Sequence, residues 1–180
     1  MKRQFNAQRL EVQAFAEDAA QLSGQGQVGD FPRLSEEAGG RGGERPVNWS
    51  AQGELINPHH VQPEVWLHLS ASTVLPLTCQ RCLEPVDVPL AVDRSFRFVA
   101  DESTAAAQDE EAEEDLLAIS RAFDLLGLVE DELLMEVPVV PRHDVCPKPV
   151  ALSVADPDFE EAEPAENPFA ALKVLKGGKG

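Results

Sequence analysis

Residues 65–98 read VWLHLSASTVLPLTCQRCLEPVDVPLAVDRSFRF, and this stretch decides the fold class. Its apolar side chains occupy odd positions up to Cys79 and even positions after Cys82. The apolar positions are Val65, Leu67, Leu69, Ala71, Leu75, Leu77 and Cys79, then Val86, Val88, Leu90, Val92, Phe96 and Phe98. Because side chains alternate between the two faces of a strand, each half predicts a strand with one apolar face. The change of phase predicts an antiparallel hairpin with Cys79-Gln80-Arg81-Cys82 at or near its turn.

The same alternation continues on the amino-terminal side of the hairpin. Val47, Trp49, Ala51 and Leu55 alternate with polar residues, and Gly53 is compatible with a bulge. We therefore expect strands near 47–55, 64–79 and 83–99. Proline lacks the N–H that a strand donates, so the prolines of the hairpin predict edges or bulges where they stand. These prolines are Pro76, Pro85 and Pro89.

A helix is predicted over Leu125–Glu136, with Asp124 as its N-cap and Pro138 beyond its end. One predicted face carries Leu126, Val129, Leu133 and Val137, and the opposite, solvated face carries Glu130, Asp131, Glu132 and Glu136. The sequence thus predicts an α+β fold. An antiparallel sheet, with a curved or barrel-like form left open, is covered by this helix, and Gly-rich and acidic segments form flexible loops.

The remaining segments suggest four parts of the chain. Residues 1–22 hold an N-terminal strand or helix, with a helix expected over Arg9–Leu22. Residues 23–45, rich in glycine, are expected to form a flexible loop in which Phe31-Pro32-Arg33-Leu34 contacts the body. The core is assigned to residues 46–150.

Two acidic stretches and a short terminal helix complete the predicted organisation. Residues 101–115 contain eight carboxylates and no basic residue, which predicts a disordered or solvated loop. Residues 151–180 are read as an acidic linker followed by a helix over 167–176. Phe169 and Leu172 form part of an apolar strip on that helix, which is a candidate for docking on the domain itself or on a partner.

The charge balance limits the classes of partner. The chain of 180 residues carries 15 Lys and Arg against 32 Asp and Glu, a net charge of −17. Sequence-blind nucleic-acid binding draws its affinity from Lys and Arg contacts with phosphates, so this charge argues against it. It also disfavours an anionic membrane surface and suits a basic protein partner. With no secretory signal and no apolar run of about 20 residues, we expect a soluble cytoplasmic protein.

The three cysteines admit three interpretations. A redox Cys-x-x-Cys needs a helix N-terminus at its first cysteine, whereas strand-like, proline-broken sequence follows Cys82. Zinc fits a pair of thiolates on a tight turn, and His143 and Cys146 would complete a four-ligand site with Cys79 and Cys82. Reduced, partly buried cysteines without metal are the third interpretation. We expect the three cysteines to lie close together whether or not zinc is present.

No catalytic motif stands out, so we predict no catalytic residues and no small-molecule substrate. Consecutive helical residues diverge by about 100°, so Glu130, Asp131 and Glu132 do not readily converge on one ion. Arg81, between the cysteines, would be presented at the hairpin tip and, with Arg94, Arg97 and the N-terminal basic residues, could form a small basic patch.

Three motifs together resemble the YceD family of large ribosomal RNA subunit accumulation proteins. They are Thr78-Cys79-Gln80-Arg81-Cys82, the run Asp124–Leu134 continuing into Pro138-Val139-Val140-Pro141-Arg142-His143, and Asn167-Pro168-Phe169-Ala170-Ala171-Leu172. The resemblance covers about residues 46–176. It implies a non-enzymatic role in the synthesis, processing or stability of large-subunit ribosomal RNA in the bacterial cytoplasm, and it supplies no catalytic residues.

Charge and resemblance together suggest a mechanism through protein partners. A strongly acidic protein is poorly suited to coating RNA, so a basic ribosomal protein or assembly factor is the expected partner, with limited RNA contact through Arg81. The candidate partner-binding residues are Arg81, Glu130, Asp131, Glu132, Phe169 and Leu172. A structural zinc module and a thiol-redox protein are the alternatives.

Overall fold

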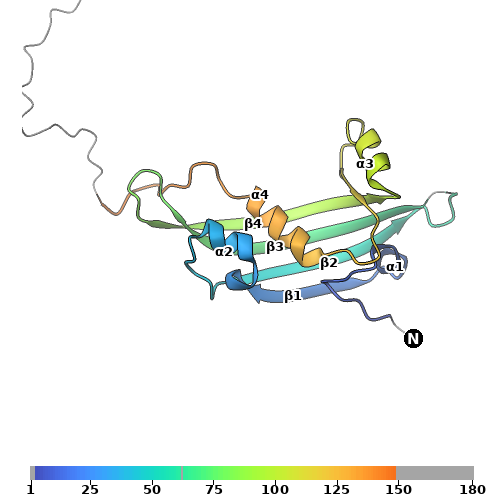
Figure 1. Cartoon of the computed structure of the whole chain (residues 1–180), viewed down its shortest axis with the longest axis horizontal. Coiled ribbons are helices and arrows are strands. Elements are labelled where there is room, and N and C mark those ends of the chain that lie inside the picture. Colours follow the sequence, from blue (N-terminus) through green and yellow to red (C-terminus); the bar gives the residue numbers. More distant parts are fainter. Residues whose placement is uncertain (1–2, 62, 149–180) are drawn as a thin grey trace, which may run out of the picture. The chain divides into compact units, whose positions relative to one another are not determined.

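A five-stranded sheet in the order β1-β2-β3-β4-β5 organises the computed structural model, which describes residues 3–61 and 63–148 (Figure 1). Its strands are β1 (Gln21–Gln27), β2 (Pro46–Ile56), β3 (Glu64–Thr78), β4 (Pro85–Val99) and β5 (Asp115–Ala118). Neighbours are antiparallel except β4 and β5, which run parallel. The predicted α+β class with an antiparallel sheet is therefore confirmed. Among the described residues β1 and β5 are the outer strands, and the sheet does not close into a barrel.

The β3–β4 hairpin has the predicted register and turn. Thr78 pairs with Pro85, so the turn spans the Cys79–Cys82 motif, and pairing is continuous from there to Val65 and Phe98. The prolines mark edges rather than bulges. Pro76 lies beyond the part of β3 that pairs with β2, and the two prolines of β4 lie outside the part that pairs with β5. Their missing N–H groups therefore cost no pairing to a second neighbouring strand.

One face of the sheet carries the core, and helices cover it (Figure 1). The helices are α1 (Val12–Glu17), η1 (Val28–Asp30), α2 (Pro32–Glu37), α3 (Glu102–Gln108) and α4 (Leu125–Met135). The predicted odd-numbered side chains of β3 and even-numbered side chains of β4 are the buried ones, with Leu67, Leu69 and Leu75 fully buried. Helix α4 packs against β3, β4 and α2.

The predicted α4 helix is confirmed, including its cap, but its buried face is rotated. The Asp124 carboxylate accepts a hydrogen bond from the Gly127 N–H at 3.0 Å. The buried residues of α4 are Leu125, Leu128, Val129, Glu130 and Leu133, whereas Leu126 is only partly buried. The placement of Glu130 on the solvated face is thus wrong, because α2 packs beside α4 and covers that side.

The two N-terminal predictions need correction. The helix expected over Arg9–Leu22 ends at Glu17, because Ala19 takes a left-handed conformation (φ +43°) and the chain turns into β1. The loop expected at 23–45 instead contains β1, η1 and α2. Within it, Phe31 and Leu34 are buried, as expected for the segment that contacts the body.

Gly24 suggested a loop and Gly53 a bulge, but in the structure each allows a neighbouring residue to pack closely against the strand backbone. A Cβ at Gly24 would lie 2.6 Å from the Trp49 ring on the paired strand. A Cβ at Gly53 would lie 2.7 Å from the Phe15 backbone oxygen, and the β2–β3 register passes through Gly53 without a bulge. Composition alone does not distinguish a glycine needed for packing from one in a flexible linker.

The acidic segment 101–115 is also more ordered than predicted. Asp101 caps α3 by accepting from the Thr104 N–H at 2.8 Å, and Asp115 begins β5. Hydrogen bonds from Ser103 and Thr104 hold the pKa of the Asp101 carboxyl below its usual value. The linker and helix predicted for 151–180 lie outside the described residues.

Candidate metal centre

The β3–β4 turn presents two thiols from a tight backbone conformation. The Cys79 N–H donates to the Glu84 carbonyl oxygen, and the Leu83 N–H donates to the Cys79 carbonyl oxygen, each at 2.9 Å. Leu83 has a left-handed backbone (φ +61°), which reverses the chain directly after Cys82. The backbone N–H groups of Arg81 and Cys82 point back to the Cys79 sulfur. The turn therefore holds both cysteines on one side before any other ligand is added.

The segment after α4 supplies the other two candidate ligands. Beyond the helix end, the Pro141 carbonyl oxygen accepts a hydrogen bond from the Gln80 N–H at 2.9 Å, which ties this segment to the hairpin turn. His143 and Cys146 follow within one short irregular stretch. Lys148 forms an ion pair with Glu84 of the turn.

The four side chains converge. One ligand atom from each of Cys79, Cys82, His143 and Cys146 lies within 4.8 Å of all the others. Zinc–sulfur bonds of about 2.3 Å in a tetrahedral site separate two sulfurs by roughly 3.8 Å, so only small adjustments are needed to reach that geometry. The expectation that the three cysteines lie close together is confirmed, and the histidine joins them.

The histidine is oriented as a metal ligand would be. Its Nε2 lies 3.0 Å from the Pro85 carbonyl oxygen, an acceptor, so Nε2 carries the hydrogen and donates it. Its Nδ1 lies 3.4 Å from the Cys82 sulfur and faces the cluster with its lone pair. A second hydrogen bond that fixes the tautomer and ring orientation is the usual support of a zinc-bound histidine.

The electrostatics of the cluster favour thiolate at its buried cysteine. Burial by itself raises the pKa of the Cys79 thiol, but the N–H groups of Cys82, His143 and Arg81 donate to its sulfur and lower the pKa to about 5. Burial raises the pKa of the Cys146 thiol, and the neighbouring Cys82 and Cys79 sulfurs raise it further. Several thiolates at this separation repel one another, and a divalent cation would relieve that repulsion.

The donor set fits zinc in a closed, structural role. Three thiolates and one imidazole fill a tetrahedron and leave no position for a water or substrate. The redox interpretation fits less well because Cys79 is fully buried and the turn leads into β4 rather than into a helix.

The acidic residues of α4 are engaged within the chain. Glu130 is 6% exposed, and its carboxylate accepts from the backbone N–H groups of Arg33 at 2.7 Å and Leu34 at 3.2 Å. It thereby caps α2 from a different helix, while the Arg33 guanidinium pairs with both Glu130 and Asp131. Sequence reasoning missed this role because no local pattern links residues about a hundred positions apart.

Glu132 contacts a basic side chain of the sheet. It lies 3.5 Å from Arg94, which also pairs with Asp115 at 2.8 Å. Burial raises the pKa of the Glu132 carboxyl, and the Arg94 charge opposes this.

Three arginines of the suggested basic patch are paired with carboxylates of the chain. Arg94 is paired with the carboxylates just described, Arg97 with Glu114, and Arg3 with Glu17 and Asp18. Arg81 is exposed at the hairpin tip, as predicted. Phe169 and Leu172 lie outside the described residues. No helix within residues 3–61 and 63–148 has the length and apolar character needed to cross a membrane.

Comparison with known proteins gives a consistent picture. Residues 67–176, more than half of the chain, match the family model described as large ribosomal RNA subunit accumulation protein YceD. A protein of that name from Haemophilus influenzae is 30% identical over 137 residues, which cover 74% of this chain and 79% of the relative. No solved structure matches the chain. All four candidate ligands lie within the matched residues.

Proposed function

Because this chain belongs to the YceD family of large ribosomal RNA subunit accumulation proteins, we propose that it supports the accumulation of large-subunit ribosomal RNA. It acts as a non-enzymatic cytoplasmic factor in ribosome biogenesis, at the level of RNA synthesis, processing or stability. The observation that carries this proposal is the family match over residues 67–176, which includes most of β3, all of β4 and α4, and the cysteine cluster.

The partner we favour is a basic protein of the assembling subunit. The net charge of −17 opposes broad contact with phosphates, and the arginines of the sheet are already paired with carboxylates. Arg81 is exposed beside the cysteine cluster and forms no ion pair with another described residue, so it is suited to one limited RNA contact.

Zinc has a structural part in this proposal. Cys79, Cys82, His143 and Cys146 would hold the ion and thereby clamp the segment after α4 onto the hairpin turn. With zinc bound, the thiolate charge would be neutralised and the turn that carries Arg81 would be rigid. Support for a non-enzymatic role comes from the closed donor set and from the engagement of the α4 carboxylates within the chain.

The cellular test measures the ratio of large-subunit to small-subunit ribosomal RNA in cells that lack the gene. We expect the ratio to fall and to be restored by the intact gene. A ratio that does not change on deletion would contradict the proposal.

The partner class is tested by affinity capture at low and high salt, with and without ribonuclease. Basic ribosomal proteins retained after ribonuclease treatment and lost at high salt would support the protein-mediated mechanism. Capture that depends entirely on RNA would contradict it. Purified protein incubated with Mg²⁺ and precursor RNA should not cleave it, whereas cleavage abolished by Asp131→Asn would indicate a nuclease instead.

A further inference from the structure

Strand β1 is an outer strand of the sheet, and in the part of the chain that the structure describes no strand pairs with its outer edge. The Gly53 N–H donates to the Ala20 carbonyl oxygen at 2.9 Å, so this pair is a hydrogen-bonded one, and bonded pairs recur at every second residue. Gly24 therefore directs its N–H and C=O toward β2. Ser23 and Gln25 direct theirs away from the sheet, where no backbone hydrogen bond to another described residue engages them.

This edge lacks the features that usually protect an edge strand. Its sequence, QLSGQGQ, contains no proline and no charged residue. Natural sheets block exposed edges with such residues, with bulges or with a covering element. Here the outward N–H of Gln27 is satisfied by the Asp30 carboxylate at 2.8 Å, so the open part of the edge ends at Gln25.

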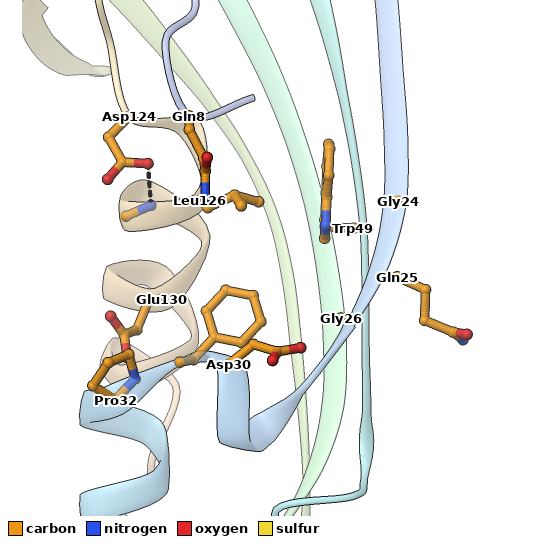
Figure 2. A pocket seen from close by; sticks show the side chains of 12 residues that line it. Gln8, Gly24, Gln25, Gly26, Asp30, Pro32, Trp49, Asp124, Leu126 and Glu130 are labelled. Atoms are coloured by element: carbon orange, nitrogen blue, oxygen red, sulfur yellow. Dashed lines mark hydrogen bonds between the residues drawn. The ribbon is translucent and has the colours of Figure 1, made fainter. Parts of the chain in front are cut away.

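A groove lies beside this edge on the helix-covered face of the sheet. It has a volume of about 680 Å³, and Trp49, Phe31 and Leu126 give it apolar walls. Figure 2 shows Trp49 between α4 and β1, with Leu126 across from it, while Gln25 points away from the groove. The groove is thus open to side chains that come from the β1 side.

The two glycines of β1 let the aromatic walls of the groove pack directly against the strand backbone, Trp49 over Gly24 and Phe31 over Gly26. Gly24 and Gly26 face the helix-covered side, and each would otherwise place a side chain at the groove's edge. Residues of an added strand that lie opposite these glycines would face the same side, because paired residues share a face. Their side chains would therefore lie against the Trp49 and Phe31 rings that form the apolar walls of the groove.

The charge of the groove selects a basic occupant. Its lining includes the carboxylates of Asp30, Asp124 and Glu130 and no Lys or Arg. Glu130 is paired with Arg33, whereas Asp30 and Asp124 are exposed and form hydrogen bonds to backbone N–H groups but no ion pair with another described residue. The protein as a whole is also strongly acidic.

We propose that β1 is a docking edge for an extended, basic segment of a protein partner, which adds a strand to the sheet and turns one face, with both apolar and basic side chains, toward the Trp49 groove. Main-chain hydrogen bonds to Ser23 and Gln25 provide affinity, and the groove and its carboxylates provide selectivity. The choice of a basic protein as the occupant rests on the proposed function.

The test uses the full chain with Trp66→Phe, which leaves Trp49 as the single tryptophan and a reporter of the groove. The probes are short synthetic peptides in which Thr occupies every second position and the positions between are Val and Lys in turn, or Val and Glu in the control, so that the charged side chains lie on the same face as Val. We expect the Lys peptide to change Trp49 fluorescence and to slow amide exchange at Ser23 and Gln25, and the Glu peptide to do neither.

Matched variants separate edge pairing from other contacts. Gln25→Pro removes an outward N–H without disturbing the β1–β2 pairing, and Gln25→Ala is its control because both variants lose the Gln25–Asn48 side-chain hydrogen bond. Gln25→Pro should bind the Lys peptide at least about tenfold more weakly than Gln25→Ala. Asp30→Asn with Asp124→Asn keeps an acceptor at each backbone N–H and should weaken binding and its dependence on salt.

Several results would overturn the inference. They are no binding of the Lys peptide, equal binding by the two Gln25 variants, displacement of the peptide by RNA from this edge, and a dimer in solution that Gln25→Pro dissociates. The last result would assign the edge to a second copy of the chain. If Gln25→Pro restores ribosomal RNA in deletion cells as well as the intact gene does, the docking edge fails while the proposed function stands. If deletion itself has no effect, the proposed function fails regardless of the peptide result.

Discussion

Two junctions attach distant segments of this protein by different chemistry. At the cysteine junction, residues 79–84 and 141–146 meet through three cysteines and a histidine. At the carboxylate junction, α2 meets α4 through Glu130 and Asp131, which bind Arg33 and the start of α2. The carboxylate junction satisfies its polar groups with protein atoms alone, whereas the cysteine junction gathers thiols that gain most from a cation.

This difference predicts which junction depends on bound metal for its stability. A buried carboxylate that accepts two backbone N–H groups and an arginine forms as soon as the helices pack. Ligand sulfurs close together form a stable arrangement only when their charge is compensated. The cysteine junction should therefore respond to metal, and the carboxylate junction should not.

Removal of metal should have the largest effect. If the free zinc concentration is about a thousand times the dissociation constant, zinc binding adds about 4 kcal/mol to the free energy of unfolding. A chelator should remove that contribution. Calorimetry should show a lower melting temperature. Hydrogen exchange should rise at 79–84 and 141–146 and stay unchanged in α2. As the control, Cys82→Ser protein should contain no zinc, and the chelator should not change its melting temperature. The metal site would be contradicted if the wild-type protein contained no metal and the chelator left its melting temperature unchanged.

Truncation of the core side chain Leu133 should have the second largest effect. Leu133 is fully buried on α4, so Leu133→Ala should lower the free energy of unfolding by about 2–5 kcal/mol. Met135 on the same helix is 75% exposed, so Met135→Ala is the control and should change it by less than about 0.5 kcal/mol. Denaturant unfolding measures both, and equal effects would mean that the packing of α4 is misassigned.

The carboxylate junction itself should show a contrast between neighbours. Glu130→Ala leaves the N–H groups of Arg33 and Leu34 without their acceptor and should cost about 1–3 kcal/mol. Asp131→Ala removes an exposed pair with the same arginine and should cost less than about 1 kcal/mol. Chemical denaturation with and without chelator checks both. A Glu130→Ala effect that appears only in the absence of metal would show that the two junctions are coupled.

The smallest effect is expected at the turn of the cysteine junction. Leu83 is 74% exposed and has a left-handed backbone, a conformation that glycine adopts more easily. Leu83→Gly should stabilise the zinc-loaded protein by up to about 1 kcal/mol, since relief of backbone strain exceeds the entropy cost of glycine. Leu83→Ala keeps the energetic cost of the left-handed backbone and should therefore not raise the free energy of unfolding. A loss of stability in the glycine variant, measured by thermal unfolding, would indicate that the Leu83 side chain packs on the cluster.

The sequence by itself determined the elements whose signal is local. Period-two alternation with a phase change identified the β3–β4 hairpin, and Asp124 with Pro138 delimited α4, because strand pleat and helix capping depend on neighbouring residues. The spacing of Cys79 and Cys82 predicted two possible metal ligands, with His143 and Cys146 as the other two. Zinc binding was nevertheless one of three interpretations that the sequence left open. Only the tertiary structure decided that these four side chains converge.

Tertiary structure also determined the conformation and contacts of segments whose sequence has no clear local pattern. Residues 21–27 became a strand because they pair with β2 and because Gly24 leaves room for Trp49. Glu130, nominally on a polar helix face, became the cap of α2 because α2 packs against that face. In both cases a long-range contact outweighed the local composition, since hydrogen bonding and burial depend on which segments meet in space and not on sequence neighbours.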